Sequence, residues 1–188
     1  MASSGTFSDV ILGCRDEQRG ALAAGEIASA PSTPKTCTIS SHQLTIGDKA
    51  SHETFGRFIE TKYGKVDVLI NNAGMAFKNA DPTPFKEQCK PTIDVNFRGA
   101  AHFTEEILPL VRKGHDARIV NVASMAGHLS QLLIIAYSFL CSIFVGSKSL
   151  STEQKMLTRI AVVTGANKGI GFHIAQHLAS SGTFSDVT

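Results

Sequence analysis

Three glycines between an apolar run and an amphipathic run have the clearest chemical meaning in this chain. The stretch TGANKGIG places Gly165, Gly169 and Gly171 after the apolar run RIAVVTG (159–165), and FHIAQHLASSG follows. Small residues let a backbone turn sharply and approach a pyrophosphate, which then lies on the N–H groups and positive dipole of a helix N-terminus. A dinucleotide phosphate is the predicted ligand, although a glycine-rich turn without a ligand has the same local pattern.

Two cationic side chains indicate which dinucleotide such a loop would bind. Arg15 follows the apolar run DVILGC (9–14), at the position where a dinucleotide-binding fold reads the adenosine ribose. An acidic residue there would accept a hydrogen bond from the 2′-hydroxyl of NAD, whereas a guanidinium pairs with the 2′-phosphate of NADP. Lys168 adds a positive charge inside the glycine loop. The two cations favour NADP(H), and the alternative is a solvated surface pair between Arg15 and Asp16.

Alternating apolar and amphipathic runs predict the elements that hold these residues. We expect strands over 9–14, 36–44, 66–74, 117–127 and 159–165. We expect helices over 15–28, 51–64, 85–114 with a bend near Pro91, and 172–182. Continuous apolar strands separated by amphipathic helices indicate a parallel sheet in an α/β fold, with helices on both faces. At 188 residues the chain is too short for two domains of ordinary size, so we expect a single domain over 1–188.

Composition excludes several classes of function. Hydrophobic residues make up 43% and charged residues 18% of the chain, which is typical of globular proteins. The net charge is +2 and the Lys and Arg residues are scattered, so we expect no nucleic-acid partner. The His and Cys residues lack metal-ligand spacing, so we expect no metal site. The cysteines show no close pairing and the N-terminus lacks the pattern of a secretory signal, which favours a reduced, cytoplasmic setting.

The most apolar stretch is LLIIAYSFLCSIFV at residues 132–145. As a helix it would span only about 21 Å, whereas a bilayer core needs about 30 Å, so a buried helix is the favoured interpretation. A membrane-associated segment is the alternative. The polar residues that follow, 146–158, are predicted to be a linker into the strand at 159–165.

Taken together, the motifs resemble the short-chain dehydrogenase/reductase family, most closely its monomeric carbonyl reductase branch. The resemblance is carried by VVTGANKGIG, HQLTIGD, VDVLINNAGMAFKNADPTPF, DVNFRG and ILPLVRKGHDARIVNVASMAG. It implies a doubly wound Rossmann sheet that binds NADP(H). It also implies an oxidoreductase that reduces a small carbonyl substrate, a ketone, aldehyde or quinone, by hydride transfer with a Tyr as proton donor.

The resemblance also implies a role for each matching residue. The cofactor contacts would be Gly165, Asn167, Lys168, Gly169, Ile170 and Gly171 as the phosphate loop, Arg15 at the 2′-phosphate, and Asn71, Ala73 and Gly74 as the NNAG motif. The catalytic residues would be Asn96, which holds a water of the proton relay, Ser124, which hydrogen-bonds the substrate carbonyl, and Tyr137.

The chain departs from the family pattern beside Tyr137. This tyrosine follows Ser124 by thirteen residues, as in compact family members, but Cys141 stands where the family has Lys. A phenol has an ordinary pKa of about 10, which a nearby cation must lower for acid–base work near neutrality. Cys141 cannot do this, and the next cation is Lys148. The alternative is that Tyr137 is a buried core residue. The protein would then be a catalytically impaired NADP(H)-binding protein that acts through interactions.

Two further departures affect the site. Thr45 replaces the usual acidic residue at the adenine, and nothing matches the strands and substrate-binding helix that follow the family's Tyr–Lys helix. The substrate pocket is therefore predicted to be incomplete.

The order of the segments is unusual, because the glycine loop opens the family's fold but lies near the end of this chain. Family order would run 150–187 and then 11–149, and ASSGTFSDV occurs twice, at 2–10 and at 179–187. We therefore predict a circularly permuted and shortened fold. The sheet has one position for the duplicated segment, and we expect the first copy to fill it because it is covalently joined to the strand. The alternative to such a monomer is a swapped oligomer.

Overall fold

The computed structural model describes residues 7–78, 80–123 and 159–181. Its strands are β1 (Asp9–Cys14), β2 (Thr38–Gln43), β3 (Val68–Asn71), β4 (Arg118–Asn121) and β5 (Ile160–Thr164). Its helices are α1 (Glu17–Ser29), α2 (Lys49–Tyr63), α3 (Phe85–Ile93), the π-helical turn η1 (Asp94–Gly99), α4 (Ala100–Val111) and α5 (Gly169–Ser181). The apolar run 132–145 and the linker 146–158 lie outside the described residues.

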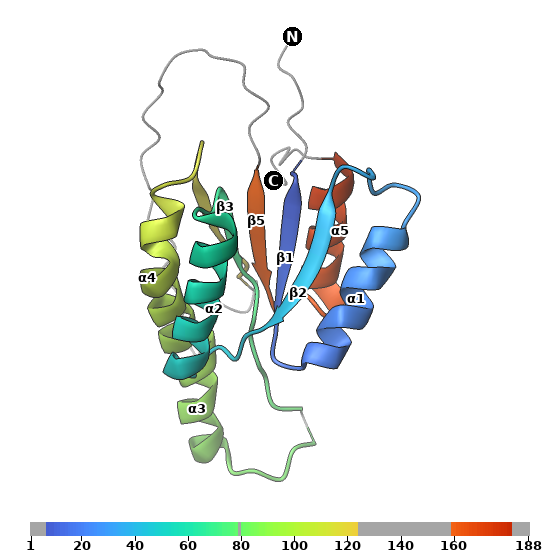
Figure 1. Cartoon of the computed structure of the whole chain (residues 1–188). Helices are drawn as coiled ribbons and strands as arrows, with labels where there is room; N and C mark the ends of the chain where they lie inside the picture. The colour runs from blue at the N-terminus through green and yellow to red at the C-terminus, as the bar shows by residue number, and fades with distance from the viewer. Residues whose placement is uncertain (1–6, 79, 124–158, 182–188) are drawn as a thin grey trace.

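The five strands form one parallel sheet in the order β2-β1-β5-β3-β4, which confirms the predicted α/β architecture. β5 is the central strand, between β1 and β3 (Figure 1). Val162 of β5, for example, lies opposite Ile11 of β1 and Leu69 of β3. Taken in the order β5, β1, β2, β3, β4, the strands have the 3-2-1-4-5 arrangement of a Rossmann sheet.

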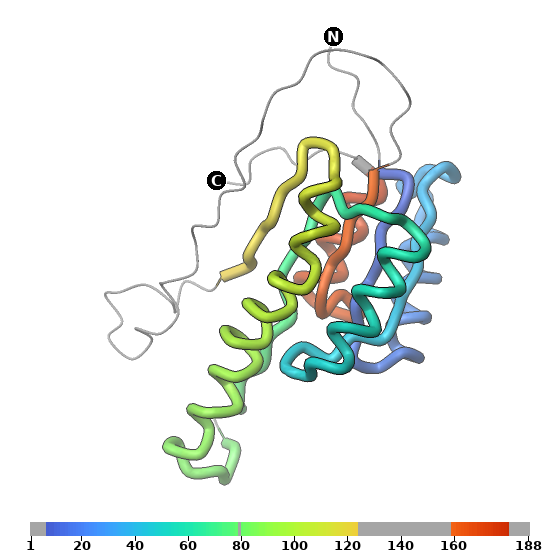
Figure 2. The backbone as a smooth tube through the Cα atoms, turned by 60° about the vertical axis from the view of Figure 1, so that its left-hand side comes forward, coloured from blue at the N-terminus to red at the C-terminus, as the bar shows by residue number. Residues whose placement is uncertain are grey.

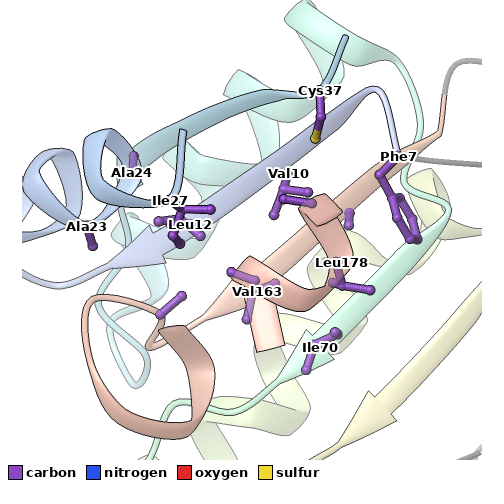
Figure 3. Close-up of a cluster of buried hydrophobic side chains, with 14 of the residues drawn as sticks. Phe7, Val10, Leu12, Ala23, Ala24, Ile27, Cys37, Ile70, Val163 and Leu178 are labelled. Carbon is purple, nitrogen blue, oxygen red and sulfur yellow. The ribbon is translucent and has the colours of Figure 1, made fainter. Parts of the chain in front are cut away.

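Helices cover both faces of the sheet, as the apolar strands predict. Successive side chains of a strand point to opposite faces. On one face α1 and α5 bury a cluster that includes Val10, Leu12, Ile27, Val163 and Leu178 (Figure 3). On the other face α2 and α4 bury a cluster that includes Ile11, Phe55, Ile59, Phe103 and Val162. No helix among the described residues is long and apolar enough to cross a membrane.

The long helix expected over 85–114 is present, but its interruption is not at Pro91. Pro91 lies inside α3, and the helix changes to the π-helical turn η1 three residues later. A π-helical turn widens the helix and changes the direction in which its side chains point. Figure 2 shows the α3 end of this helix extending away from the sheet, and no residue of α3 is buried.

His52 is a buried imidazole between the loop after β2 and helix α4. Its exposed fraction is 3%, its Nε2 atom accepts a hydrogen bond from the Gly47 N–H at 3.2 Å, and its ring meets the edge of Phe103. Burial lowers the pKa of His52 below its usual 6.5, the charge of Asp48 opposes this shift, and His102 adds to it. The neutral imidazole is therefore the form that fits the folded protein.

We expect the free energy of unfolding to fall as the pH drops below about 6.5, because protons then bind the unfolded chain more readily than His52 in the folded protein. Well above pH 6.5 the imidazole is neutral in both states and contributes no pH dependence. Urea unfolding measured across this range checks the prediction, and His52→Gln should flatten the curve. His173→Gln, at an exposed position of α5, is the control. An unchanged curve in His52→Gln would contradict the assignment.

Candidate functional site

The candidate site lies at the carboxyl ends of the three central strands. β1 and β3 lie on opposite sides of β5 and their crossovers run outward in opposite directions, which is where open α/β sheets bind ligands. Helix α5 begins at Gly169, shortly after β5 ends at Thr164. The loop between them is tied to β1, because the Gly165 N–H donates to the Gly13 carbonyl at 2.8 Å.

Each of the three loop positions requires glycine for a different structural reason. Gly165 has φ +64°, and a Cβ there would lie 2.8 Å from the Cα of Ala73. A Cβ on Gly171 would lie 2.3 Å from Asn72 Nδ2 and 2.8 Å from the Gly165 carbonyl oxygen. Gly169 has φ +62° and open space where its Cβ would be. The backbone is therefore packed tightly beneath the loop and open above the start of α5, as a phosphate on a helix N-terminus requires.

Thr164 and Asn72 hold this loop in place, and the sequence reasoning missed both. The Thr164 Oγ1 atom accepts hydrogen bonds from the N–H groups of Asn72 and Ala73, each at 3.0 Å. Asn72 Nδ2 donates to the carbonyl oxygens of Thr164 at 3.1 Å and Gly165 at 3.3 Å. Asn72 lies inside the NNAG motif and Thr164 opens TGANKGIG, which was the available signal, but their pairing joins segments about ninety residues apart.

The NNAG residues divide between two sides of β3. Ala73 lies against Gly165, so it belongs to the glycine loop's surroundings. Asn71 faces α4 and β4, because its Nδ2 atom donates to Thr104 Oγ1 and Asn121 Oδ1, each at 2.9 Å. The Asn71 Oδ1 atom is buried without a hydrogen-bond partner among the described residues. The Asn71 amide thus ties β3 to α4 and β4, and its place in the cofactor site that the resemblance implies stays a prediction.

Asn96 in η1 fixes the chain that leaves β3. Its Oδ1 atom accepts from the Met75 N–H at 2.7 Å, and its Nδ2 atom donates to the Met75 carbonyl at 2.8 Å. A Cβ on Gly74 would lie 3.4 Å from the same Oδ1 atom. The side-chain amide therefore holds the backbone that follows the NNAG motif.

A cavity of about 150 Å³ lies between α4 and β4. Its lining includes Asn71, Asn96, Thr104, Asn121 and Ala123. Position 124 follows this lining directly in the chain. Ser124, Tyr137, Cys141 and Lys148 lie outside the described residues, so their roles stay predictions.

The two predicted cations, Arg15 and Lys168, are both exposed. The expected alternative partner of Arg15 is engaged elsewhere. Asp16 caps α1 by accepting from the Arg19 N–H at 3.0 Å and pairs with the Arg19 guanidinium at 3.4 Å. Neither Arg15 nor Lys168 has a hydrogen bond or ion pair within the described residues. Both positive charges are therefore available to an anion at this edge of the sheet.

Two buried thiols, Cys14 and Cys37, should be chemically inert. Burial is the main cause that raises the pKa of Cys14 to about 11, against a hydrogen bond with the Ala166 backbone. Burial and the charge of Asp9 raise the pKa of Cys37 to about 11. We expect iodoacetamide at pH 8 to label the exposed Cys89 and to leave both buried thiols unlabelled, as peptide mapping would show. Labelling of Cys14 in the folded protein at the rate of Cys89 would contradict this.

The parallel sheet, its central strand and the glycine loop define a Rossmann-type α/β protein. Residues 8–139 match the family model described as short chain dehydrogenase. The chain belongs to this short-chain dehydrogenase family.

Curated relatives of this chain carry the name carbonyl reductase. The chain is 41% identical over 116 residues to carbonyl reductase [NADPH] 1 of Bos taurus, which covers 62% of this chain and 39% of the relative. It is 41% identical over 117 residues to carbonyl reductase [NADPH] 1 of Homo sapiens, covering 62% of this chain and 40% of the relative. The chain thus spans about two fifths of the length of these relatives.

Solved structures show the same fold at lower identity. Menthone neomenthol reductase from Mentha piperita has a TM-score of 0.57 and 22% identity, over 67% of this chain and 63% of that chain. Salutaridine reductase from Papaver somniferum has a TM-score of 0.54 and 23% identity, over 65% of this chain and 58% of that chain.

Proposed function

We propose that this chain binds NADP(H), with the pyrophosphate at the loop Gly165–Gly171 and the 2′-phosphate at Arg15 and Lys168. The geometry of the glycines carries the proposal, because the loop is closely packed beneath Gly171 and open above Gly169. The two cations have no partners within the described part of the chain. Curated relatives named for NADPH support the choice of dinucleotide.

The proposed reaction is reduction of a small ketone, aldehyde or quinone. The bound cofactor would supply a hydride to the carbonyl carbon. Ser124 would hydrogen-bond the carbonyl oxygen and Tyr137 would give its proton to the forming alkoxide. Asn96 fixes the chain after β3 through Met75 and would hold the water of the proton relay.

A second candidate function is NADP(H) binding without turnover, in a protein that acts through interactions. The observation that favours it is Cys141 at the position of the family's Lys. A thiol in its neutral form cannot lower the pKa of a neighbouring phenol as an ammonium does.

NADPH consumption with a reactive quinone separates the two functions. The reductase proposal predicts a rate that Tyr137→Phe lowers by about two orders of magnitude, the usual size of a general acid's contribution. Cys141→Lys should raise the rate if only the cation is missing. No consumption by a folded, NADPH-binding protein, with no gain in Cys141→Lys, would leave the binding function alone.

We also propose that the chain order is a permutation of the family's order. In a Rossmann sheet of order 3-2-1-4-5 the first strand of the chain is the central strand. In this protein β5, which carries the glycine loop, occupies that central position, and this supports the proposal. The polar residues 146–158 would then be the linker that joins the two ends of the parent order, and polar linkers are positions where rearrangement of chain order is tolerated.

A further inference from the structure

The duplicated segment gives one buried position two identical candidate occupants. Residues 2–10 and 179–187 both read ASSGTFSDV, so Phe184 and Ser185 repeat Phe7 and Ser8. In the structure Phe7 and Ser8 lead directly into β1 at Asp9. We call this position the entry slot. It consists of the pocket around the Phe7 ring and the backbone groups that hydrogen-bond with Ser8.

The entry slot is a closed part of the core. Phe7 is 1% exposed and belongs to the same cluster as Leu178 and Ala179 of α5. Figure 3 labels Phe7 and Leu178 within this cluster. The guanidinium carbon of Arg159 lies 4.5 Å from the centroid of the Phe7 ring. A benzyl side chain therefore fills the slot with both apolar contact and a cation over its face.

Ser8 holds the backbone of the slot through three hydrogen bonds. Its N–H donates to the Arg159 carbonyl at 3.0 Å, and its hydroxyl donates to the same oxygen at 2.8 Å. The Ser8 carbonyl accepts from the Thr38 N–H at 2.7 Å. Any Phe-Ser dipeptide in the same backbone conformation can repeat these contacts, since they require only the backbone and a serine hydroxyl.

The second copy begins beside this slot. Ala179 and Ser180 already lie in α5, which ends at Ser181, and residues 182–188 follow. Phe184 is three residues beyond the end of the helix, and three residues reach at most about 10 Å. A tethered segment this short has a high effective concentration at a site near its anchor. Leu178 and Ala179 anchor it in the very cluster that Phe7 fills.

We propose that the second copy is an intramolecular reserve occupant of the entry slot, with Phe184 replacing Phe7 whenever the first copy leaves. The first copy has the advantage while it is intact, because Ser8 and Asp9 are continuous with β1. The second copy would thus bind the entry slot through the Phe7 pocket and the Arg159 carbonyl, as a segment of the same chain.

A double-mutant cycle on the melting temperature tests the proposal. Phe184→Ala alone should leave the melting temperature unchanged, and Phe7→Ala alone should lower it by only a few degrees. The double variant should lose roughly 10 °C more, because no ring is then left to fill the pocket. The matched control is Phe55→Ala, another fully buried ring, to which Phe184→Ala should add nothing.

Two results would overturn the proposal. Equal melting temperatures for Phe7→Ala and the double variant would mean that Phe184 does not enter the slot. A difference that disappears on dilution would mean that the replacement comes from a second molecule rather than the same chain. If Phe7→Ala fails to fold, Phe7→Leu with and without Phe184→Ala gives the same comparison at lower cost to the core.

Discussion

Gly171→Ala is expected to weaken NADPH binding by about a hundredfold or more. The added Cβ would lie 2.3 Å from Asn72 Nδ2, 2.8 Å from the Gly165 carbonyl oxygen and 3.1 Å from Ala166 Cα. Two of these neighbours are backbone of the loop itself, so the loop must shift to make room. A shifted loop loses backbone hydrogen bonds to the phosphate, and hydrogen bonds to a charged group contribute about 1.5–3 kcal/mol each, which for one or two bonds reaches about a hundredfold in affinity. Fluorescence titration with NADPH measures the dissociation constant.

The matched control is Gly25→Ala in α1. A Cβ on Gly25 has nothing within 4 Å, so the substitution tests the loss of a glycine without a clash. Alanine favours a helix over glycine by about 1 kcal/mol, and we expect this variant to be at least as stable as the wild type with unchanged NADPH binding. Wild-type affinity in Gly171→Ala would contradict the assigned phosphate loop.

Asp67→Ala is expected to cause the largest loss of stability of any single polar substitution among the described residues. Asp67 is fully buried at the amino end of β3. Its carboxylate accepts from the Ile160 N–H at 2.7 Å and the His115 N–H at 2.5 Å, and pairs with Lys65 at 3.1 Å. These bonds join β3 to β5 and to the turn before β4. Removing the carboxylate leaves the Ile160 and His115 N–H groups without their acceptor, and each buried donor left unsatisfied costs about 1–3 kcal/mol.

Urea unfolding of Asp67→Ala and Asp67→Asn measures this loss. Asparagine retains one acceptor oxygen but points an amide N–H₂ at a backbone N–H. The free energy of unfolding of Asp67→Asn should therefore lie between those of the wild type and Asp67→Ala. Glu60→Ala is the control, since Glu60 pairs with Lys113 at 3.6 Å and both side chains are more than half exposed. Such a surface pair contributes about 0–1 kcal/mol. A loss for Asp67→Ala no greater than for Glu60→Ala would refute this role of Asp67.

The sheet was predictable from the sequence because residues close together in the chain determine each strand. Four of the five strands contain a short apolar run that ends at a glycine or polar motif, whereas β2 (TISSHQ) is largely polar. Parallel pairing follows from the helices between the strands. The glycine loop was predictable for the same reason, since Gly165, Gly169 and Gly171 stand together between a strand and a helix.

The contacts that complete the site were not predictable, because they cross the sheet. Nothing near Thr164 indicates that its hydroxyl accepts from the N–H groups of Asn72 and Ala73. The position of η1 was missed because Pro91 was the visible irregularity, whereas the turn forms where Asn96 reaches Met75. Asn71 and Asn72 are identical in type and adjacent, yet Asn71 is the last residue of β3 and Asn72 the first residue after it, and their side chains have different neighbours.

The proposed NADP(H) site lies where the glycine loop of β5 meets the ends of β1 and β3. Calorimetric titration of the whole chain with NADPH, and with NADH beside it, tests this most directly. We predict saturable binding of NADPH, and binding of NADH weaker by about tenfold or more because it lacks the phosphate that Arg15 and Lys168 would pair with. The absence of saturable NADPH binding by a protein that unfolds cooperatively would contradict the account.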